Sequence, residues 1–148
     1  MSGKLPPSNG RQRFRTTWCG IQVAANMYLH HVVRMTEPGF LEQRAHHYMM
    51  HLFRRELSQL TARLEEPDSD INRDFLFWHY FLGAIHMYKN DEESPTAEFF
   101  YQGICDWSKA TGVTEWADAW AALRGVSWPA EYPDELTGQS VWERARYR

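Results

Sequence analysis

With 148 residues, the chain has the length of one domain, and such a domain can bury roughly two thirds of the surface that its unfolded chain exposes. Its residues are 43% hydrophobic and 15% aromatic, which excludes a disordered or low-complexity chain. The net charge of −3 excludes a general electrostatic attraction to nucleic acid or to an acidic membrane surface.

Residues 1–15 differ from the rest of the chain in composition. They include prolines and glycines, show no hydrophobic period and contain no acidic residue, but they carry four basic side chains: Lys4, Arg11, Arg13 and Arg15. We expect them to form a flexible basic leader, although a short basic arm could also touch an anion. Residues 16–148 are predicted to form a single domain.

The two cysteines give no sign of a metal site or a disulfide. Cys19 and Cys105 lie far apart among apolar neighbours, and neither has a second cysteine or a histidine at the spacing of a zinc motif. We expect buried free thiols. The sequence also lacks a recognisable signal peptide and a long apolar span, so the expected location is intracellular, cytoplasmic or nuclear, with no membrane partner.

Hydrophobic periodicity predicts helices and no strand. A first helix is expected over Trp18–Met35, where apolar residues recur at spacings of three and four: Trp18, Ile21, Ala25, Tyr28, Leu29 and Val32. Pro38 and Gly39 end it. A second, amphipathic helix is expected over about Phe40–Glu65, and the acidic turn 65–70 follows it.

The stretch Phe75–Tyr88 is the most apolar in the chain and has no polar face. Only His79 and His86 interrupt it with ionisable groups, and their spacing of seven residues is two helical turns. A helix that is hydrophobic all round must be covered on all sides, and this one is too short to cross a bilayer. We therefore expect a core helix, capped by Asn72 or Asp74, on which the other helices pack.

Three further elements are predicted after the core helix. Pro95 begins a fourth helix that Gly112 closes. Thr114 is expected to cap a fifth helix that ends before Gly125. A tryptophan-rich loop over 126–137 and a short helix from about Ser140 complete the chain. The predicted fold is thus all-α, a compact bundle of about five helices around the apolar one.

Aromatic and glycine motifs follow one another in a distinctive order from the core helix to the C-terminus. They are Phe77-Trp78-His-Tyr-Phe-Leu-Gly83, Phe99 with Trp107, Gly112-Val-Thr-Glu-Trp116, Ala119 with Leu123, Trp128-Pro129, Asp134, Gly138 and Val141-Trp142-Glu143. In this order they resemble the C-terminal end of the fungal-specific transcription factor regulatory domain. The earlier helix with Tyr28-Leu29-His30 fits the penultimate helical hairpin of that family, so the resemblance spans about Thr16 to Glu143.

The chain also departs from this family. Its members usually carry an N-terminal zinc binuclear cluster that is made by six cysteines and binds DNA through a basic helix. This chain has two cysteines without such spacing, which excludes DNA recognition by that route. The regulatory domain of the family is also much longer than 148 residues. The resemblance therefore implies a stand-alone part of a regulator, either degenerate or adapted to a new use.

Two functional hypotheses follow, together with the possibility of a remnant without activity. The first is a helical module that binds an apolar small molecule or a protein partner, because missing helices could leave an apolar cavity. A second copy of the chain could also cover an exposed face, giving a homodimer. The alternative is a cofactor-free enzyme of fungal secondary metabolism, of the cyclase or pericyclase, isomerase or dehydratase type, which folds an apolar substrate in an aromatic cavity.

Candidate site residues come from the core helix and from the aromatic positions. The candidate catalytic residues are His79, His86 and Tyr80. Burial favours a neutral imidazole, which is the state that a general base needs, although each histidine could simply bond a neighbouring carbonyl or hydroxyl group. The candidate ligand-binding residues are Tyr28, Trp78, Phe81, Trp107 and Trp120, which could equally be core residues.

No cofactor and no physiological metal are expected. Two pairs of histidines could gather on facing helices: His30 with His31, and His47 with His51. They match no known ligand pattern, because no HExxH or di-iron spacing accompanies them.

Overall fold

The computed structural model describes residues 23–28, 31, 43–129 and 135–147, with the side chains of 43–47 left out. Every regular element in these ranges is a helix and none is a strand, which confirms the predicted all-α class. The expectations for the leader 1–15, for Cys19 and for most of the first helix lie outside the described residues. None of the described helices is both long enough and apolar enough to span a membrane.

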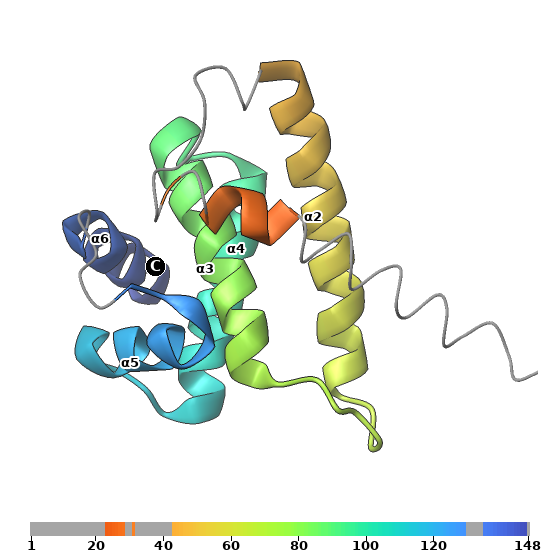
Figure 1. Ribbon diagram of the computed structural model, residues 1–148, viewed down its shortest axis with the longest axis vertical. Coiled ribbons are helices and arrows are strands. Elements are labelled where there is room, and N and C mark those ends of the chain that lie inside the picture. Colours follow the sequence, from red (N-terminus) through yellow and green to blue (C-terminus); the bar gives the residue numbers. More distant parts are fainter. Residues whose placement is uncertain (1–22, 29–30, 32–42, 130–134, 148) are drawn as a thin grey trace, which may run out of the picture.

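Helix α3 (Arg73–Asn90) is the centre of the bundle, as the sequence predicts. It packs against α4 most extensively and also contacts α2, α5 and α6 (Figure 1). Every residue from Leu76 to Met87 is buried. Asn72 rather than Asp74 is the cap, and its side-chain oxygen accepts hydrogen bonds from the backbone N–H groups of Asp74 and Phe75 at 2.8 and 3.2 Å.

Helices α2 (Gln43–Leu64) and α4 (Pro95–Thr111) lie alongside α3. The predicted ends of α4 are confirmed, because Ser94 caps its start just before Pro95 and Gly112 ends it with a φ of 76°. A Cβ atom on Gly103 would lie 2.1 Å from Cδ1 of Tyr80, so glycine permits the close approach of α4 to α3 at this point.

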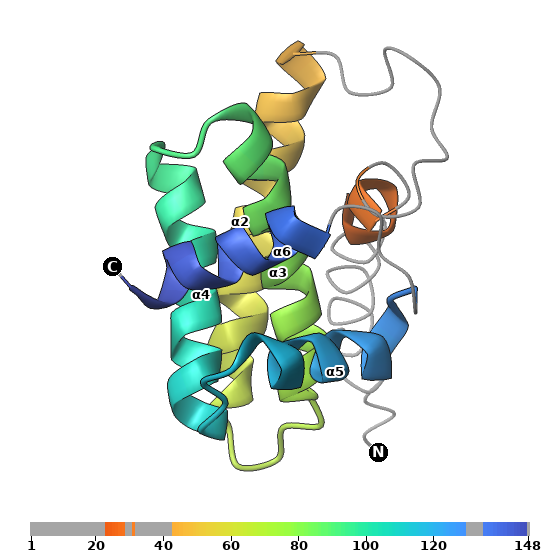
Figure 2. The ribbon, with the colours of Figure 1, turned by 90° about the vertical axis from the view of Figure 1, so that its left-hand side faces the viewer.

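Helices α5 (Trp116–Ser127) and α6 (Glu135–Arg146) cross the long axes of α2, α3 and α4, as Figure 2 shows. Both correct the sequence prediction. Glu115, not Thr114, occupies the N-cap position of α5, and this helix continues through Gly125, which is exposed and has open space around it. The predicted loop 126–137 therefore contains the end of one helix and the start of another.

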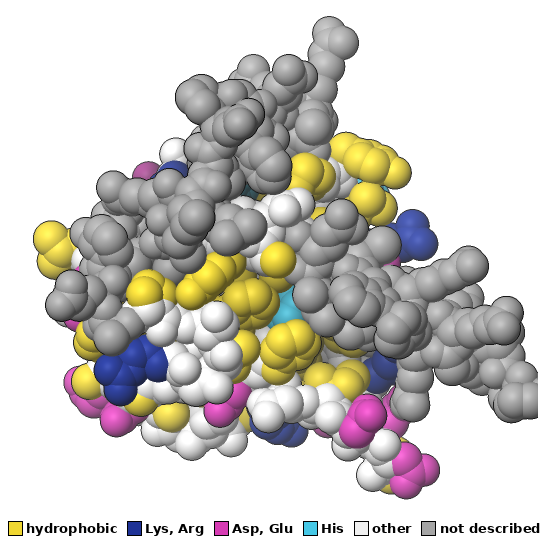
Figure 3. Space-filling model, viewed as in Figure 1, with side chains coloured by type: hydrophobic (Ala, Val, Ile, Leu, Met, Phe, Trp, Pro, Cys, Tyr) yellow, Lys and Arg dark blue, Asp and Glu magenta, His cyan; other side chains and the backbone are white. Residues whose placement is uncertain are grey.

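The early start of α6 has a tertiary cause. Four residues at helical spacing are buried, chiefly where α6 packs on α4: Gly138, Val141, Trp142 and Ala145. This burial stabilises three helical turns where local sequence signals predict only a short one. In the space-filling view of Figure 3, hydrophobic side chains gather across the middle of the face and charged side chains lie toward its border.

Candidate functional site

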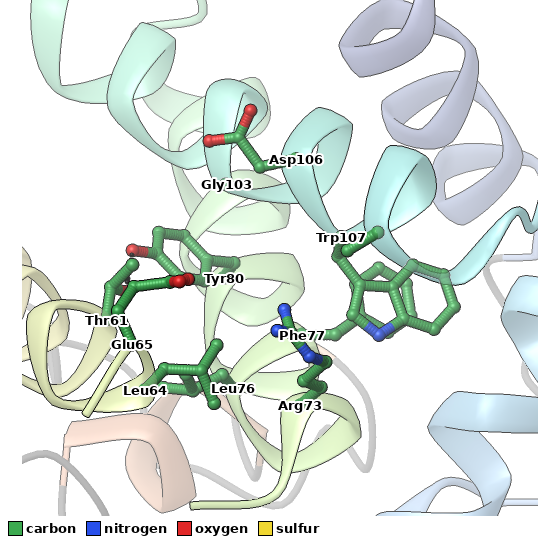
Figure 4. Close-up of a pocket in the computed structure, with 11 residues that line it drawn as sticks. Thr61, Leu64, Glu65, Arg73, Leu76, Phe77, Tyr80, Gly103, Asp106 and Trp107 are labelled. Atoms are coloured by element: carbon green, nitrogen blue, oxygen red, sulfur yellow. Dashed lines mark hydrogen bonds between the residues drawn. The ribbon is translucent and has the colours of Figure 1, made fainter. Parts of the chain in front are cut away.

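A pocket of about 270 Å³ lies between α2, α3 and α4 (Figure 4). Three successive parts of the chain line it. These are the end of α2 and the residue after it, with Thr61, Leu64 and Glu65, the first half of α3 with Arg73, Leu76, Phe77 and Tyr80, and α4 with Gly103, Asp106, Trp107 and Ala110. The first half of α3 forms its floor, and α2 and α4 form its walls.

The apolar part of the pocket is built on a stacked pair of rings. Phe77 and Trp107 lie 3.7 Å apart between ring centroids and are inclined by only 6°. Trp142 of α6 contacts both rings edge-on, at 6.1 and 6.2 Å. The indole N–H of Trp107 donates a hydrogen bond to the carboxylate of Asp74 at 3.0 Å. These contacts fix both ring planes, so this part of the pocket is preformed.

The polar part of the pocket centres on two hydroxyl groups. The Tyr80 hydroxyl and the Thr61 hydroxyl lie 2.6 Å apart and share a hydrogen bond in which either can donate. Burial raises the pKa of Tyr80; the bond from Thr61 opposes the shift, and the Asp106 carboxylate adds to it. The phenol therefore stays protonated at neutral pH and offers a hydrogen bond without acting as a base.

The rim of the pocket carries charge. Glu65, Arg73 and Asp106 are exposed lining residues, one from each of the three surrounding parts of the chain. The Asp106 carboxylate accepts a hydrogen bond from the Gln102 amide at 2.8 Å. In Figure 4 the Asp106 side chain lies at the top of the view, and the guanidinium of Arg73 points between Tyr80 and Trp107.

His79 lies outside this pocket and is completely buried. Its Nδ1–H donates a hydrogen bond to the backbone carbonyl of Phe75 at 2.7 Å, so its Nε2 carries the lone pair, and no described residue bonds to that atom. The rings of Phe53, Phe75 and Trp78 surround it. This apolar surround lowers the pKa of His79 to about 4, against the smaller effect of the Phe75 bond.

His86 belongs to a buried histidine pair that the sequence does not reveal. Its Nδ1 lies 2.6 Å from Nε2 of His31, and one of these nitrogens donates while the other accepts. Both side chains are buried, at 2% and 4% exposure. The structure thus places His79 and His86 on α3 as predicted, and it gives His86 a histidine partner that the sequence interpretation did not consider.

Three of the predicted ligand-binding residues belong to a different aromatic cluster. Trp78 lies 5.9 Å from Tyr28 between ring centroids, and Trp128 contacts both Tyr28 and Phe81 at 6.0 and 5.8 Å. The Trp78 indole N–H donates to the backbone carbonyl of Ser127 at 2.9 Å. This cluster joins the segment 23–28, α3 and the end of α5. Its members pack against one another rather than on the pocket between α2, α3 and α4.

Trp120 is half-buried on α5, where the Arg124 guanidinium lies 5.2 Å from its ring centroid. Among the eight predicted site residues, only Tyr80 and Trp107 line the pocket. The sequence interpretation missed the polar lining residues Thr61, Glu65, Arg73 and Asp106, and it did not name Phe77 as a site residue. Thr61 lies between Leu60 and Leu64 at the edge of an apolar stripe, and this position is the one local signal that could have indicated it.

The described residues contain no group of three His, Cys, Asp or Glu side chains that could hold a metal ion. Of the four histidines considered for such a group, His30 and the His47 side chain lie outside the described part of the chain. His51 is an exposed residue of α2, and His31 pairs with His86.

Comparison with protein-family models, with curated proteins and with solved structures gives no match for the chain. The fold and the site by themselves define the class of the chain as an all-α bundle with a preformed pocket between three of its helices. The resemblance to the fungal-specific transcription factor regulatory domain stays a prediction from the sequence.

Proposed function

We propose that this chain is a helical ligand-binding module, and that its site is the pocket between α2, α3 and α4. The observation that carries the proposal is the combination of a stacked Phe77–Trp107 pair with a hydroxyl pair, Tyr80 and Thr61, around one space of about 270 Å³. Mainly apolar walls with a few convergent polar groups are typical of small-molecule sites. The expected ligand is a small, mainly apolar molecule with one polar end.

The energy for binding comes from apolar burial. Each 100 Å² of apolar surface that leaves water contributes about 2.5 kcal/mol before the cost of association is subtracted. Because contacts with Asp74 and Trp142 already hold the ring of Trp107, little side-chain freedom is lost when the ligand binds. Preorganisation of this kind lets even a small pocket bind measurably.

Cofactor-free catalysis is less well supported than binding. A cyclase or isomerase would need its substrate to contact a general base, and neither His79 nor His86 lines this pocket. Tyr80 does line it, but its raised pKa makes it a hydrogen-bond donor rather than a base. The resemblance to the C-terminal part of a fungal regulatory domain supports a binding role of the same kind. A protein partner or a second copy of the chain remains the competing proposal for that role.

An NMR titration with a neutral aromatic probe tests the proposal. We expect 3-methylindole to shift the indole N–H signal of Trp107, because the side chain of Trp107 lines the pocket. Ala110 is exposed on α4 and lines the pocket, so Ala110→Phe should fill the mouth and weaken binding about tenfold or more.

The matched control is Ala121→Phe, which adds the same ring at an exposed position of α5 away from the pocket. This variant should bind 3-methylindole as the parent protein does. Equal weakening by both variants, or no shift of the Trp107 signal with the parent protein, would contradict the proposed site.

A further inference from the structure

The pocket carries more negative than positive charge at its open end. Glu65 and Asp106 each contribute a carboxylate to the lining, whereas Arg73 contributes one guanidinium. A third carboxylate, that of Asp74, lies against the wall, where it accepts the hydrogen bond of the Trp107 indole. Glu65, Arg73 and Asp106 are exposed, so the charged groups meet solvent where a ligand would enter.

Arg73 and Asp106 lie on different sides of the space that the pocket leaves open. Arg73 is the first residue of α3, and in Figure 4 its guanidinium points between Tyr80 and Trp107, whereas the Asp106 side chain lies across the space from it. The charge of the Asp106 carboxylate reaches the Tyr80 hydroxyl, because it adds to the rise in the pKa of Tyr80 that burial causes. A ligand group that lies between Asp106 and Tyr80 therefore experiences a negative field.

We propose that this pocket binds a small aromatic amine as a cation, with its flat ring against Trp107 and its ammonium group near Glu65 and Asp106. The inference rests on the proposed function and adds the charge of the ligand to it. The ring packs against the apolar walls, and the ammonium group pairs with the carboxylates at the mouth. The hydroxyl pair of Tyr80 and Thr61 offers an oxygen that can accept a further hydrogen bond from the ammonium group.

Charge should determine selectivity more than affinity in this pocket. The two lining carboxylates are exposed, and ion pairs at exposed positions change an equilibrium by about two- to fivefold each. Burial of the ring supplies the larger part of the binding free energy and is the same for a neutral analogue. A cation should therefore bind more tightly than its neutral isostere by a modest factor, and an anion should bind least.

Three probes with the same ring system separate charge from shape. Tryptamine is a cation at neutral pH, 3-methylindole is neutral, and indole-3-propionate is an anion. We expect the dissociation constants, measured from the Trp107 indole N–H signal, to increase in that order, with about fivefold between tryptamine and 3-methylindole. Added salt should reduce the difference between them.

Substitutions that remove either a negative or a positive charge test whether these residues cause the charge selectivity. Asp106→Asn and Glu65→Gln should each reduce the preference for tryptamine over 3-methylindole, taken as the ratio of the two dissociation constants in the same variant, about two- to fivefold. Arg73→Gln removes the one positive charge of the lining and should strengthen tryptamine binding by a similar factor. All three positions are exposed, so the fold should persist in each variant.

Different results would contradict the inference about charge and the proposed site. If 3-methylindole binds in the pocket but tryptamine and indole-3-propionate bind equally well, the inference about charge is wrong and the proposed function stands. Binding of indole-3-propionate in preference to tryptamine would likewise overturn the charge assignment and indicate that Arg73 dominates. If none of the three probes shifts the Trp107 signal at millimolar concentration, both the inference and the proposed site are overturned.

Discussion

Two sides of the same helix meet different surroundings in this protein. One side of α3, with Leu76, Phe77 and Tyr80, forms the floor of a pocket whose rim is charged and exposed. The other, with His79 and His86, is sealed by aromatic rings and by a second histidine. All five side chains are buried to a similar degree, at 6% exposure or less.

The difference shows that burial alone does not identify a site. The histidines are the more reactive residue type, yet the surroundings of His79 hold it neutral, and neither histidine lines the pocket between α2, α3 and α4. Tyr80 is of a less reactive residue type, but its hydroxyl group shares a hydrogen bond with Thr61 and its side chain lines the pocket. Access to a space between elements, rather than residue type, separates the candidate site from the core.

The largest expected effect comes from adding a methyl group at Gly103, where α4 lies against the Tyr80 ring of α3. Gly103→Ala would place a Cβ atom 2.1 Å from the Tyr80 ring, which must then move. Overpacking of this kind should lower the free energy of unfolding by about 3 kcal/mol. Denaturant titration measures it, and the control is Gly125→Ala, where nothing lies within 4 Å.

The control should act in the opposite direction. Gly125 lies inside α5, so alanine there should raise the free energy of unfolding by about 0.5–1 kcal/mol. Similar values for both variants would show that the Tyr80 ring does not lie against Gly103.

The sealed histidine should make stability depend on pH. The pKa of His79 is lowered from 6.5 to about 4 in the folded state, so the unfolded chain binds its proton more readily. Stability is then complete above pH 6.5, is lost as the pH falls and levels off below the folded pKa; the loss between pH 7 and pH 5 is about 2 kcal/mol.

His79→Leu isolates this contribution from those of the other histidines. The free energy of unfolding of this variant should fall by about 2 kcal/mol less than that of the parent protein over the same pH range. Parallel pH profiles for the two proteins would mean that His79 is protonated as easily in the fold as in the unfolded chain, and the contrast between the two sides of α3 would fail.

The smallest effect on the free energy of unfolding is expected from the hydrogen bond between the two hydroxyl groups of the pocket. Tyr80→Phe and Thr61→Val each remove one partner of the 2.6 Å hydrogen bond. A double-mutant cycle should give a coupling energy of about 1 kcal/mol in the free energy of unfolding. A coupling energy near zero would indicate that the two hydroxyl groups bond water instead of each other.

Local sequence signals predict much of the fold. The core helix is recognisable because Phe75–Tyr88 has no polar face, and α4 because Ser94, Pro95 and Gly112 are strong end signals. The boundaries of α5 and α6 are wrong in the prediction, because glycine only modestly disfavours a helix and packing on α4 extends α6.

The candidate site is less predictable, because it depends on contacts between distant residues. Tyr80 meets Thr61 across 19 positions, and His86 meets His31 across 55. Nothing in the local sequence around Asp106 or Arg73 indicates that both line one space. Aromatic residues mark the core in general, and the sequence does not separate Trp107, which lines the pocket, from Trp78 and Phe81, which belong to another cluster.

The most direct test of the account is to locate a bound neutral probe by intermolecular NOEs. With 3-methylindole, we predict contacts from its ring to the methyl groups of Leu64 and Leu76 and to the ring of Trp107. Contacts to the ring protons of His79 or to the cluster of Tyr28, Trp78 and Trp128 instead would place the site on the other side of α3 and contradict the account.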